Sequence, residues 1–559
     1  MNIIKQSAAL STERSTPPDG RTRRDLLPVR LVWQSPRPCQ PIKARRLLEP
    51  SSNQVHLEKI KCCRMSKRGS AILLDFGKEL YGGIQIVSRS ESAEPTKIRI
   101  RFGESVSEAM SDPVNDHGVH DVTANLPQYS SYEFGSTGFR FVRVDLLSDA
   151  ASLNLLSIRA ISLLHELPWR GSFESSDARL NQIWATGART VQLCLQDYLW
   201  DGIKRDRLVW AGDLHPEICV TNAVFGEVPL VAHTLDFIRD ITPAPRWMNG
   251  FSSYSLWWLL CQRDWFLYHG NKSYLKSQRD YLEDLLPQIL AHVGKDGAER
   301  LPETRFIDWA SHADEKAKHA GLHGLLTWAC AAGAELASHL RLSPLERACA
   351  AAVTKLKRHQ PELTSFKQSE ALLVLAGIRS SKWTNQNVLS VNPTRDLSPF
   401  MGYYILQARA RAGDIQGALN LVREYWGGML DRGATSFWEA FDLEWLRHSG
   451  RIDQLTQTGK KDIHGDFGQY CYQGFRHSLC HGWSAGPTAW LSEEVLGFLP
   501  LQPGSRVLRL NPQIGSLRYV EGSFPTPYGD VKVKHSRTAS GVKTVFHAPS
   551  EVRVIQNQK

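Results

Sequence analysis

The chain has 559 residues and a net charge of +10, with an ordinary share of apolar residues for a globular protein. Residues 1–70 hold 15 of the 67 Lys and Arg and 5 of the 57 Asp and Glu, so the remainder carries 52 of each. A neutral body argues against nucleic-acid binding, and no apolar run reaches the ~18–20 residues of a membrane helix. The N-terminus lacks the apolar core of a secretory signal, so we expect a cytoplasmic protein as written, or a periplasmic or secreted one if the true N-terminus carries a signal.

Two kinds of segment precede residue 169. Residues 1–50 are rich in Ser, Pro, Thr and Arg without periodicity, which predicts a basic tail that is disordered in part. Residues 51–168 contain short runs in which apolar and polar residues alternate, the pattern of half-buried strands. The runs are AILLDFG (71–77), GGIQIVSRS (82–90), KIRIRFGE (97–104) and FRFVRVDLL (139–147). We predict an N-terminal antiparallel β-sandwich.

A long helical region follows from 169 to 499. Ser175, Ser176 or Asp177 can cap its first helix, because their side-chain oxygens accept free backbone NH groups. Further helical patterns occur at 252–269, 273–293, 316–340, 344–358, 367–378, 400–412, 415–430, 437–449 and 487–497. No regular repeat of the solenoid type is present, so we predict a toroid of helical hairpins. Alternation returns in residues 500–559, which predicts a small C-terminal β-domain.

The charged stretch DGIKRDRLVWAGDLHPE spans residues 201–217. Gly202, Gly212 and Pro216 make one regular helix improbable, so we expect a loop with at most a short turn. Loops on a rigid scaffold often carry reactive side chains. The stretch offers four acids and two arginines that could position them or grip sugar hydroxyls: Asp201, Asp206, Asp213, Glu217, Arg205 and Arg207. An ion-pair network that only pins the loop between helices explains the same spacing.

Three other loops place an aromatic ring near a carboxylate or an imidazole. They contain Asp308 with Trp309, Trp438 with Glu439, and His477 and His481 with Trp483. Tryptophan faces can stack on the CH-rich faces of sugars, although core packing is the commoner reason for any single Trp. Glycoside hydrolysis needs two carboxyl groups, one as acid and one as base or nucleophile. Asp206 and Glu439 could supply this pair if the toroid brings them together.

Other chemistries find weaker support in the sequence. His312, His319 and His323 include an i, i+4 pair that could share a helix face, but there is no HExxH pattern and no assigned third ligand. The ten cysteines are scattered without CxxC pairs, which fits free thiols in a reducing compartment. The sequence has no GxSxG elbow, no GxxxxGK[ST] loop and no dinucleotide fingerprint. We predict neither a metal nor an organic cofactor.

Several of these segments resemble the α-L-rhamnosidase family of glycoside hydrolases. DGIKRDRLVWAGD resembles that family's loop, which reads roughly D-x-x-x-R-[DE]-[ER]-x-x-W-x-G-D, and TSFWEAFD resembles the segment with its second catalytic carboxylate. GSFESSDARLNQIW looks like the family's entry into an (α/α)6 barrel. DFGKELYGGIQI with FGSTGFRFVRV, and GSFPTPYGDVKV, are similar to its β-sandwich and its C-terminal β-domain. The likeness runs from about residue 70 to residue 559.

The resemblance implies a β-sandwich at 51–168, an (α/α)6 catalytic barrel at 169–499 and a β-domain at 500–559. It implies an inverting hydrolase that releases terminal α-L-rhamnose, or a related deoxy or uronic sugar, from a carbohydrate partner. Asp206 falls at the position of the general acid and Glu439 at that of the general base. Together with the loops described above, the expected sugar-binding residues are Asp201, Arg205, Arg207, Trp210, Asp213, Asp308, Trp309, Trp438, His481 and Trp483. The oligomeric state is not specified.

One position departs from the family. Most members carry Glu where this chain has Asp206, and Asp is shorter by one methylene, roughly 1.5 Å. A general acid has to reach the glycosidic oxygen, so either the loop lies closer, or the acid is Asp213 or Glu217, or the glycosidic preference differs. The remaining alternatives are a glycan-binding protein with weak catalysis and another helical-toroid enzyme, such as a lyase or a phosphorylase.

Overall fold

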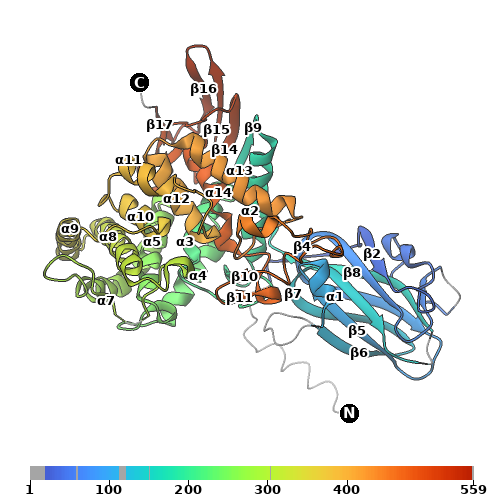
Figure 1. Ribbon diagram of the computed structural model, residues 1–559. Helices are drawn as coiled ribbons and strands as arrows, with labels where there is room; N and C mark the ends of the chain where they lie inside the picture. Colours follow the sequence, from blue (N-terminus) through green and yellow to red (C-terminus); the bar gives the residue numbers. More distant parts are fainter. Residues whose placement is uncertain (1–18, 58–60, 113–120, 150–151, 303, 557–559) are drawn as a thin grey trace.

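The computed structural model describes residues 19–57, 61–112, 121–149, 152–302 and 304–556. Figure 1 shows a sheet domain beside a helical domain, and a smaller set of strands packed on the helical domain near the C-terminus. The predicted order of a β-domain, a helical toroid and a second β-domain is therefore confirmed. Among the described helices, none combines the length and the apolar composition needed to cross a membrane.

The N-terminal domain is an antiparallel sheet with eight strands among the described residues. The strands are β1 (Thr22–Leu26), β2 (Arg30–Gln34), β3 (Cys63–Met65), β4 (Ala71–Ser90), β5 (Thr96–Gly103), β6 (Asp121–Leu126), β7 (Tyr129–Leu146) and β8 (Leu153–Leu164). Their order is β1-β8-β4-β7-β5-β6, with β2 on β4 and β3 on β8. The long strands β4 and β7 take part in both halves of the sheet, one with β2 and β5 and the other with β8. Alternate side chains from both halves form one buried apolar core.

This sheet begins earlier in the chain than the sequence indicates. The prediction of a partly disordered tail over residues 1–50 is wrong from residue 22 onward, because β1 pairs with β8 and β2 pairs with β4. A short 3-10 helix (Ala44–Leu48) then buries Ala44 and Leu47. The sequence of β1 gives no alternation signal, because β1 is an edge strand with mostly exposed, charged residues. Residues 1–18 lie outside the described residues.

Six helices form a closed inner ring in the described part of the second domain. They are α3 (Leu214–Val224), α5 (Ser252–His269), α8 (Glu315–His339), α10 (Lys367–Leu375), α12 (Pro399–Arg411) and α14 (Gly486–Trp490). Each helix contacts the next one in this order, and α14 contacts α3 again. Every residue of α3 and of α10 is buried, including the polar ones. A helix that is covered all around belongs inside the domain rather than on its surface.

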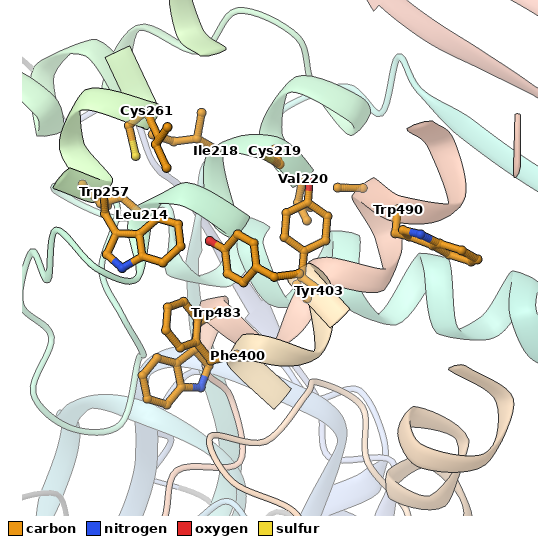
Figure 2. Close-up of a cluster of buried hydrophobic side chains, with 14 of the residues drawn as sticks. Leu214, Ile218, Cys219, Val220, Trp257, Cys261, Phe400, Tyr403, Trp483 and Trp490 are labelled. Atoms are coloured by element: carbon orange, nitrogen blue, oxygen red, sulfur yellow. The ribbon is translucent and has the colours of Figure 1, made fainter. Parts of the chain in front are cut away.

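A second layer of helices lies outside this ring. Its members are α2 (Ala178–Cys194), α4 (Pro229–Asp240), α6 (Lys272–Ser277), α7 (Arg279–Leu290), α9 (Ser343–Leu356), α11 (Ser381–Thr384) and α13 (Ile415–Asp431). In α7, Leu282, Leu285, Leu286 and Ile289 recur at the i, i+3, i+4, i+7 spacing of one helix face, and that face is the buried one. Figure 2 shows how apolar side chains from α3, α5, α12 and α14 meet in the core of the ring.

The charged stretch at 201–217 is a loop only in its first part. Helix α3 begins at Leu214 and continues through Pro216 and Glu217. Proline is tolerated in the first turn of a helix because the NH groups there have no intrahelical acceptor. The structure therefore corrects the expectation of a loop as far as residue 217: the loop ends at about Asp213.

The C-terminal strands form two small sheets. One contains β12 (Phe498–Pro500), β13 (Val507–Leu510) and β17 (Arg553–Gln556), and the other contains β16 (Gly541–His547), β15 (Gly529–Thr538), β14 (Tyr519–Thr526) and β9 (Ser172–Ser175). Strand β9 precedes the helices in the chain and pairs antiparallel with β14, as Figure 1 shows in teal and red. The predicted boundaries at 169 and 500 thus assign two paired strands to different domains.

Candidate active site

A pocket of about 290 Å³ opens at the N-terminal ends of α3 and α5, where several loops meet. The described residues that line it are Asp201, Arg205, Asp206, Trp210, Asp213, Phe251, Tyr254, Phe306, Trp309, Glu439, Cys471, Tyr472, Arg476, His481 and Trp483. All four loops singled out in the sequence contribute to this lining. The helical ring therefore brings together segments that are more than 200 residues apart in the chain.

Main-chain hydrogen bonds shape the loop that carries Asp206. Asp201 and Leu208 are joined twice, because the NH of Asp201 donates to the Leu208 carbonyl at 3.1 Å and the NH of Leu208 donates to Asp201 Oδ1 at 2.9 Å. The NH of Gly482 donates to the Asp201 carbonyl at 2.8 Å, which anchors the loop to the segment before α14. Asp206 and Arg207 have φ angles of 50° and 53°, in the left-handed region. These two residues turn the chain back between the joined ends.

The segment that carries Glu439 is not helical, so the predicted helix over 437–449 is wrong. Its backbone NH groups bond to other parts of the chain: Phe437 to Thr190 Oγ1 at 3.0 Å, Glu439 to the Ser478 carbonyl at 2.9 Å, and Ala440 to His477 Nε2 at 2.9 Å. These partners satisfy donors that a helix would satisfy internally. A short 3-10 turn (Leu443–Leu446) is the regular structure that follows within the predicted range.

Arg205 joins the two candidate catalytic carboxylates. Its Nη1 lies 3.1 Å from Asp206 Oδ1, and its Nη2 donates to Glu439 Oε2. Its Nε donates to the Arg476 carbonyl at 2.5 Å, so the guanidinium is held from three sides. One guanidinium group therefore contacts an oxygen of Asp206 and an oxygen of Glu439 at the same time. This ion pair is part of the pocket lining as well as a support for the loop.

Burial and positive charge act on Glu439 in opposite directions. The side chain is 2% exposed, and this burial raises the pKa of its carboxyl. Arg205 opposes the rise, as does the NH of Ser478, which donates to Glu439 Oε2 at 3.0 Å, because both favour the ionised form. The other oxygen, Oε1, lies 3.6 Å from His481 Nδ1. The guanidinium therefore favours the ionised form of Glu439, whereas burial favours its protonated form.

Two further aspartates lie beside this pair. Asp213 Oδ2 lies 3.1 Å from His481 Nε2, so the imidazole stands between Asp213 and Glu439. Burial raises the pKa of Asp213, and His481 opposes that rise. Burial also raises the pKa of Asp201 well above its usual value, and the neighbouring Asp213 charge adds to the effect. The pocket therefore offers both hydrogen-bond donors and acceptors to a polyhydroxylated ligand.

Aromatic rings form the walls of the pocket. Trp210, Trp309 and Trp483 line it, as the sequence predicts. Trp309 Nε1 donates to the Tyr472 hydroxyl at 2.8 Å, and Trp483 Nε1 donates to the Glu439 carbonyl at 3.0 Å. Trp483 also stacks on Phe400, beside which it lies in Figure 2. Indole rings fixed by their polar edges present flat apolar faces of the kind that a sugar ring requires.

Sequence reasoning missed several lining residues. They are Phe251, Tyr254, Phe306, Cys471, Tyr472 and Arg476. Phe306 lies two positions before Asp308 in a loop that the sequence analysis already predicts to carry site residues. Its position in that loop could therefore have identified it as a lining residue. Phe251 and Tyr254 lie at the start of α5 without charged neighbours, and nothing in the local pattern distinguishes them from core residues.

The structure does not bring three predicted sugar-binding residues to this pocket. The Arg207 guanidinium donates to the Ser136 carbonyl of β7 at 2.8 Å, away from the described lining. Asp308 is buried and is not among the residues that line the pocket. Trp438 packs in the core against Phe441. Glu439 thus lines the pocket, whereas the preceding residue, Trp438, lies in the core.

Glu217, an alternative acid in the sequence, also lies outside the described lining. It is fully buried on α3, and neither carboxyl oxygen has a hydrogen-bond partner among the described residues. Burial raises the pKa of this carboxyl well above its usual value. A Cβ at Gly482 would lie 1.6 Å from Glu217 Oε1, so main chain covers this carboxyl. Its position does not suit contact with a ligand.

The three histidines considered as metal ligands have other partners. His319 Nδ1 lies 2.7 Å from Glu299 Oε1, His323 Nε2 lies 3.1 Å from the Leu356 carbonyl, and the His312 ring packs on Trp309. Two other groups in the described part of the chain place possible ligand atoms within 4.8 Å of one another. They are His215 with Cys219 and Asp264, and Glu104 with Glu108 and His464.

Comparison with known proteins matches two parts of the chain. Residues 168–329 match the bacterial alpha-L-rhamnosidase six-hairpin glycosidase domain, and residues 497–555 match the bacterial alpha-L-rhamnosidase C-terminal domain. The helical ring and its pocket thus define a six-hairpin glycosidase fold. Within that class, the two matches confirm the resemblance to the α-L-rhamnosidase family.

Solved structures support the same fold over most of the chain. The GH78 family rhamnosidase of Bacillus sp. GL1 superposes with a TM-score of 0.73 and 21% identity, over 94% of this chain and 56% of that one. A Klebsiella oxytoca rhamnosidase solved with rhamnose bound gives 0.64 and 19%, over 85% and 96% of the two chains. An alpha-L-rhamnosidase of Alteromonas sp. (strain LOR) is 34% identical over 77 residues, which are 14% of this chain and 8% of that protein. The chain therefore spans little more than half of the Bacillus protein and a small part of the Alteromonas one.

Proposed function

We propose that this protein is a glycosidase that releases terminal α-L-rhamnose, or a closely related deoxy sugar, with inversion at the anomeric carbon. The observation that carries the proposal is the contact of Arg205 with both Asp206 and Glu439 in a pocket walled by aromatic rings. The Klebsiella relative, whose structure holds rhamnose, supports the choice of sugar.

Asp206 suits the role of general acid. Its side chain is 31% exposed, whereas that of Glu439 is 2% exposed, so Asp206 stands on the open side where a leaving group can depart. The carboxyl proton of Asp206 passes to the glycosidic oxygen as the bond from that oxygen to the anomeric carbon breaks. Asp213 is less suited, because it is buried against His481.

Glu439 suits the role of general base. It accepts a proton from a water molecule whose oxygen forms the new bond to the anomeric carbon, on the face opposite the leaving group. Inverting glycosidases keep their two carboxyl groups ~6.5–9.5 Å apart to leave room for this water. After release of the sugar, Glu439 gives its proton to solvent and Asp206 takes one up, so the enzyme returns to its starting state.

A leaving-group series tests the role of Asp206. We expect Asp206→Asn to lower kcat/KM on phenyl α-L-rhamnoside by ~10²–10⁴ and on the dinitrophenyl analogue much less, because a good leaving group departs without a proton. Arg207→Gln is the matched control, because Arg207 is the next residue of the same loop but does not line the pocket. It should stay within about threefold of the unmodified protein.

Other outcomes of this assay would contradict the proposal in distinct ways. Equal losses on both substrates, or no loss, would remove Asp206 from the acid role. Binding of rhamnosides without any release of sugar would indicate a glycan-binding protein. An unsaturated product would indicate a lyase, and a strict requirement for phosphate a phosphorylase.

A further inference from the structure

Glu104 connects the sheet domain to both catalytic segments. It follows β5, precedes α1 (Val106–Met110) and has no exposed surface. We propose that Glu104 is a positioning residue that fixes Asp206 and Glu439 relative to each other from outside the helical domain. This inference rests on the proposed function, because it names a support for the same two carboxylates.

The first arm of the connection reaches the loop of the candidate acid. Glu104 Oε2 lies 3.2 Å from Lys204 Nζ, and Glu108 Oε1 lies 3.0 Å from the same nitrogen. Lys204 stands two residues before Asp206 in the chain. Its ammonium also donates to the His477 carbonyl at 2.9 Å. Lys204 therefore connects the loop that carries Asp206 to the segment that contacts Glu439.

The second arm reaches the candidate base. The NH of Leu479 donates to Glu104 Oε2 at 2.7 Å, and Ser478 Oγ lies 3.4 Å from Glu104 Oε1. The NH of Ser478 donates to Glu439 Oε2 at 3.0 Å. Two consecutive NH groups therefore bond to Glu104 and to Glu439, and a displacement of Glu104 would shift the peptide that holds the base.

The cost of burying charge supports a positioning role over a purely stabilising one. The side chains of Lys204, Glu104 and Glu108 are at most 2% exposed. Taking such charges out of water offsets most of their mutual attraction, and apolar residues of similar size often stabilise a fold as well or better. If one of these three side chains is removed, the charges of the other two stay buried without their partner. The three side chains are therefore held in one arrangement.

A bound cation is the alternative use of this cluster, since Glu104, Glu108 and His464 place possible ligand atoms within 4.8 Å of one another. The Lys204 ammonium lies against both carboxylates and supplies the positive charge that a cation would bring. His464 in turn is occupied on both ring nitrogens, by Ser105 Oγ at 2.7 Å and by the His477 carbonyl at 2.9 Å.

Glu79 offers a matched control at the same boundary between domains. It is also buried, and its NH donates to Thr435 Oγ1 at 2.9 Å while its carbonyl accepts from Arg189 at 2.7 Å. Its carboxyl Oε1 has no hydrogen-bond partner among the described residues, and burial raises the pKa of this group well above its usual value. Glu79→Gln therefore changes a buried carboxyl whose Oε1 bonds to none of the residues that hold Asp206 and Glu439.

The test compares the unmodified protein with Glu104→Gln and Glu79→Gln on phenyl α-L-rhamnoside. Because small displacements of a catalytic group cost up to ~10²-fold in rate, we expect Glu104→Gln to lower kcat by ~10–100-fold. KM should stay within about threefold, since the sugar-contacting side chains are unchanged. Glu79→Gln should retain the unmodified kcat. Glu104→Asp, which keeps the charge but withdraws from Leu479, should lose kcat in the same way if Glu104→Gln does not fold.

Amide hydrogen exchange separates this inference from the proposed activity. We expect faster exchange in 201–213 and 476–482 of the Glu104 variants and not of Glu79→Gln. Unchanged kcat and unchanged exchange in the Glu104 variants would overturn the inference. If the unmodified protein releases no rhamnose, the proposed function fails, and the exchange comparison alone decides whether Glu104 holds the two segments.

Discussion

Two tryptophans of the helical domain differ in what their rings contact. Trp309 lines the pocket and is fixed through its Nε1, whereas Trp438 is 1% exposed in the core. We expect Trp309→Ala to raise KM for an aryl rhamnoside about tenfold, because it removes a flat wall of the pocket. We expect Trp438→Ala to lower the free energy of unfolding by ~3–5 kcal/mol, because it leaves a large cavity.

Steady-state kinetics and urea unfolding of both variants check this pair of expectations. The reverse pattern, with stability lost at Trp309 and KM raised at Trp438, would mean that the pocket wall is assigned to the wrong ring. Both tryptophans stand beside a carboxylate in the sequence, so only the direction of each side chain distinguishes them.

The backbone at residue 206 gives a physical reason for the shorter side chain at the proposed acid position. Asp206 and Arg207 both lie in the left-handed region. Aspartate visits that region more readily than longer side chains, because its short polar group can hydrogen-bond locally. A loop with this conformation therefore favours Asp over Glu at residue 206, and Arg205 holds the short carboxylate beside Glu439.

At the scale of elements, periodicity predicted five helices closely, but it gave no helix at α3 or α4 and a single helix over 273–293, where α6 and α7 lie. The observed bounds of α5, α8, α9, α12 and α13 lie within two residues of the predicted ranges, because each has a continuous apolar pattern and a recognisable start or end. The strands that the sequence did not reveal include β1, an exposed edge strand, β2, which lies in the predicted tail, and β9, a four-residue strand that pairs with β14. Such elements depend on distant partners that no local pattern records.

The same limit applies to the site. The sequence identified four of the segments that line the pocket, because charge and aromatic rings are concentrated in them. It did not identify the start of α5 or the stretch with Cys471 and Tyr472. It could not show that the segment at 437–442 is not helical, because that depends on acceptors at Thr190, Ser478 and His477. The direction of each side chain, and with it the exclusion of Trp438 from the pocket, follows from this tertiary pairing.

At the scale of the whole molecule, buried carboxyls make stability depend on pH. Glu493 lines a different pocket from the proposed catalytic pair, accepts from the Tyr403 hydroxyl at 2.9 Å, and has its pKa raised to about 7 by burial. Because the folded pKa exceeds the unfolded one, this group's contribution is full below about pH 4.5 and is lost as the pH rises to about 7. Glu493→Gln removes that dependence. We expect the variant to gain ~1–3 kcal/mol on the unmodified protein between pH 5 and pH 8.

Urea unfolding at both pH values measures this difference, and kcat on an aryl rhamnoside serves as the control. A constant difference between the two proteins across the pH range would show that Glu493 keeps an ordinary pKa in the folded state. A loss of kcat would mean that the variant disturbs more than this carboxyl.

The proposed function requires that Asp206 and Glu439 hydrolyse an α-L-rhamnoside with inversion. The most direct measurement is proton NMR of the unmodified protein acting on phenyl α-L-rhamnoside, with spectra taken before the released sugar can mutarotate. We expect the β-anomer of rhamnose to accumulate first and the α-anomer to follow only as equilibrium is reached. Early accumulation of the α-anomer, or no release of rhamnose at all, would contradict this expectation.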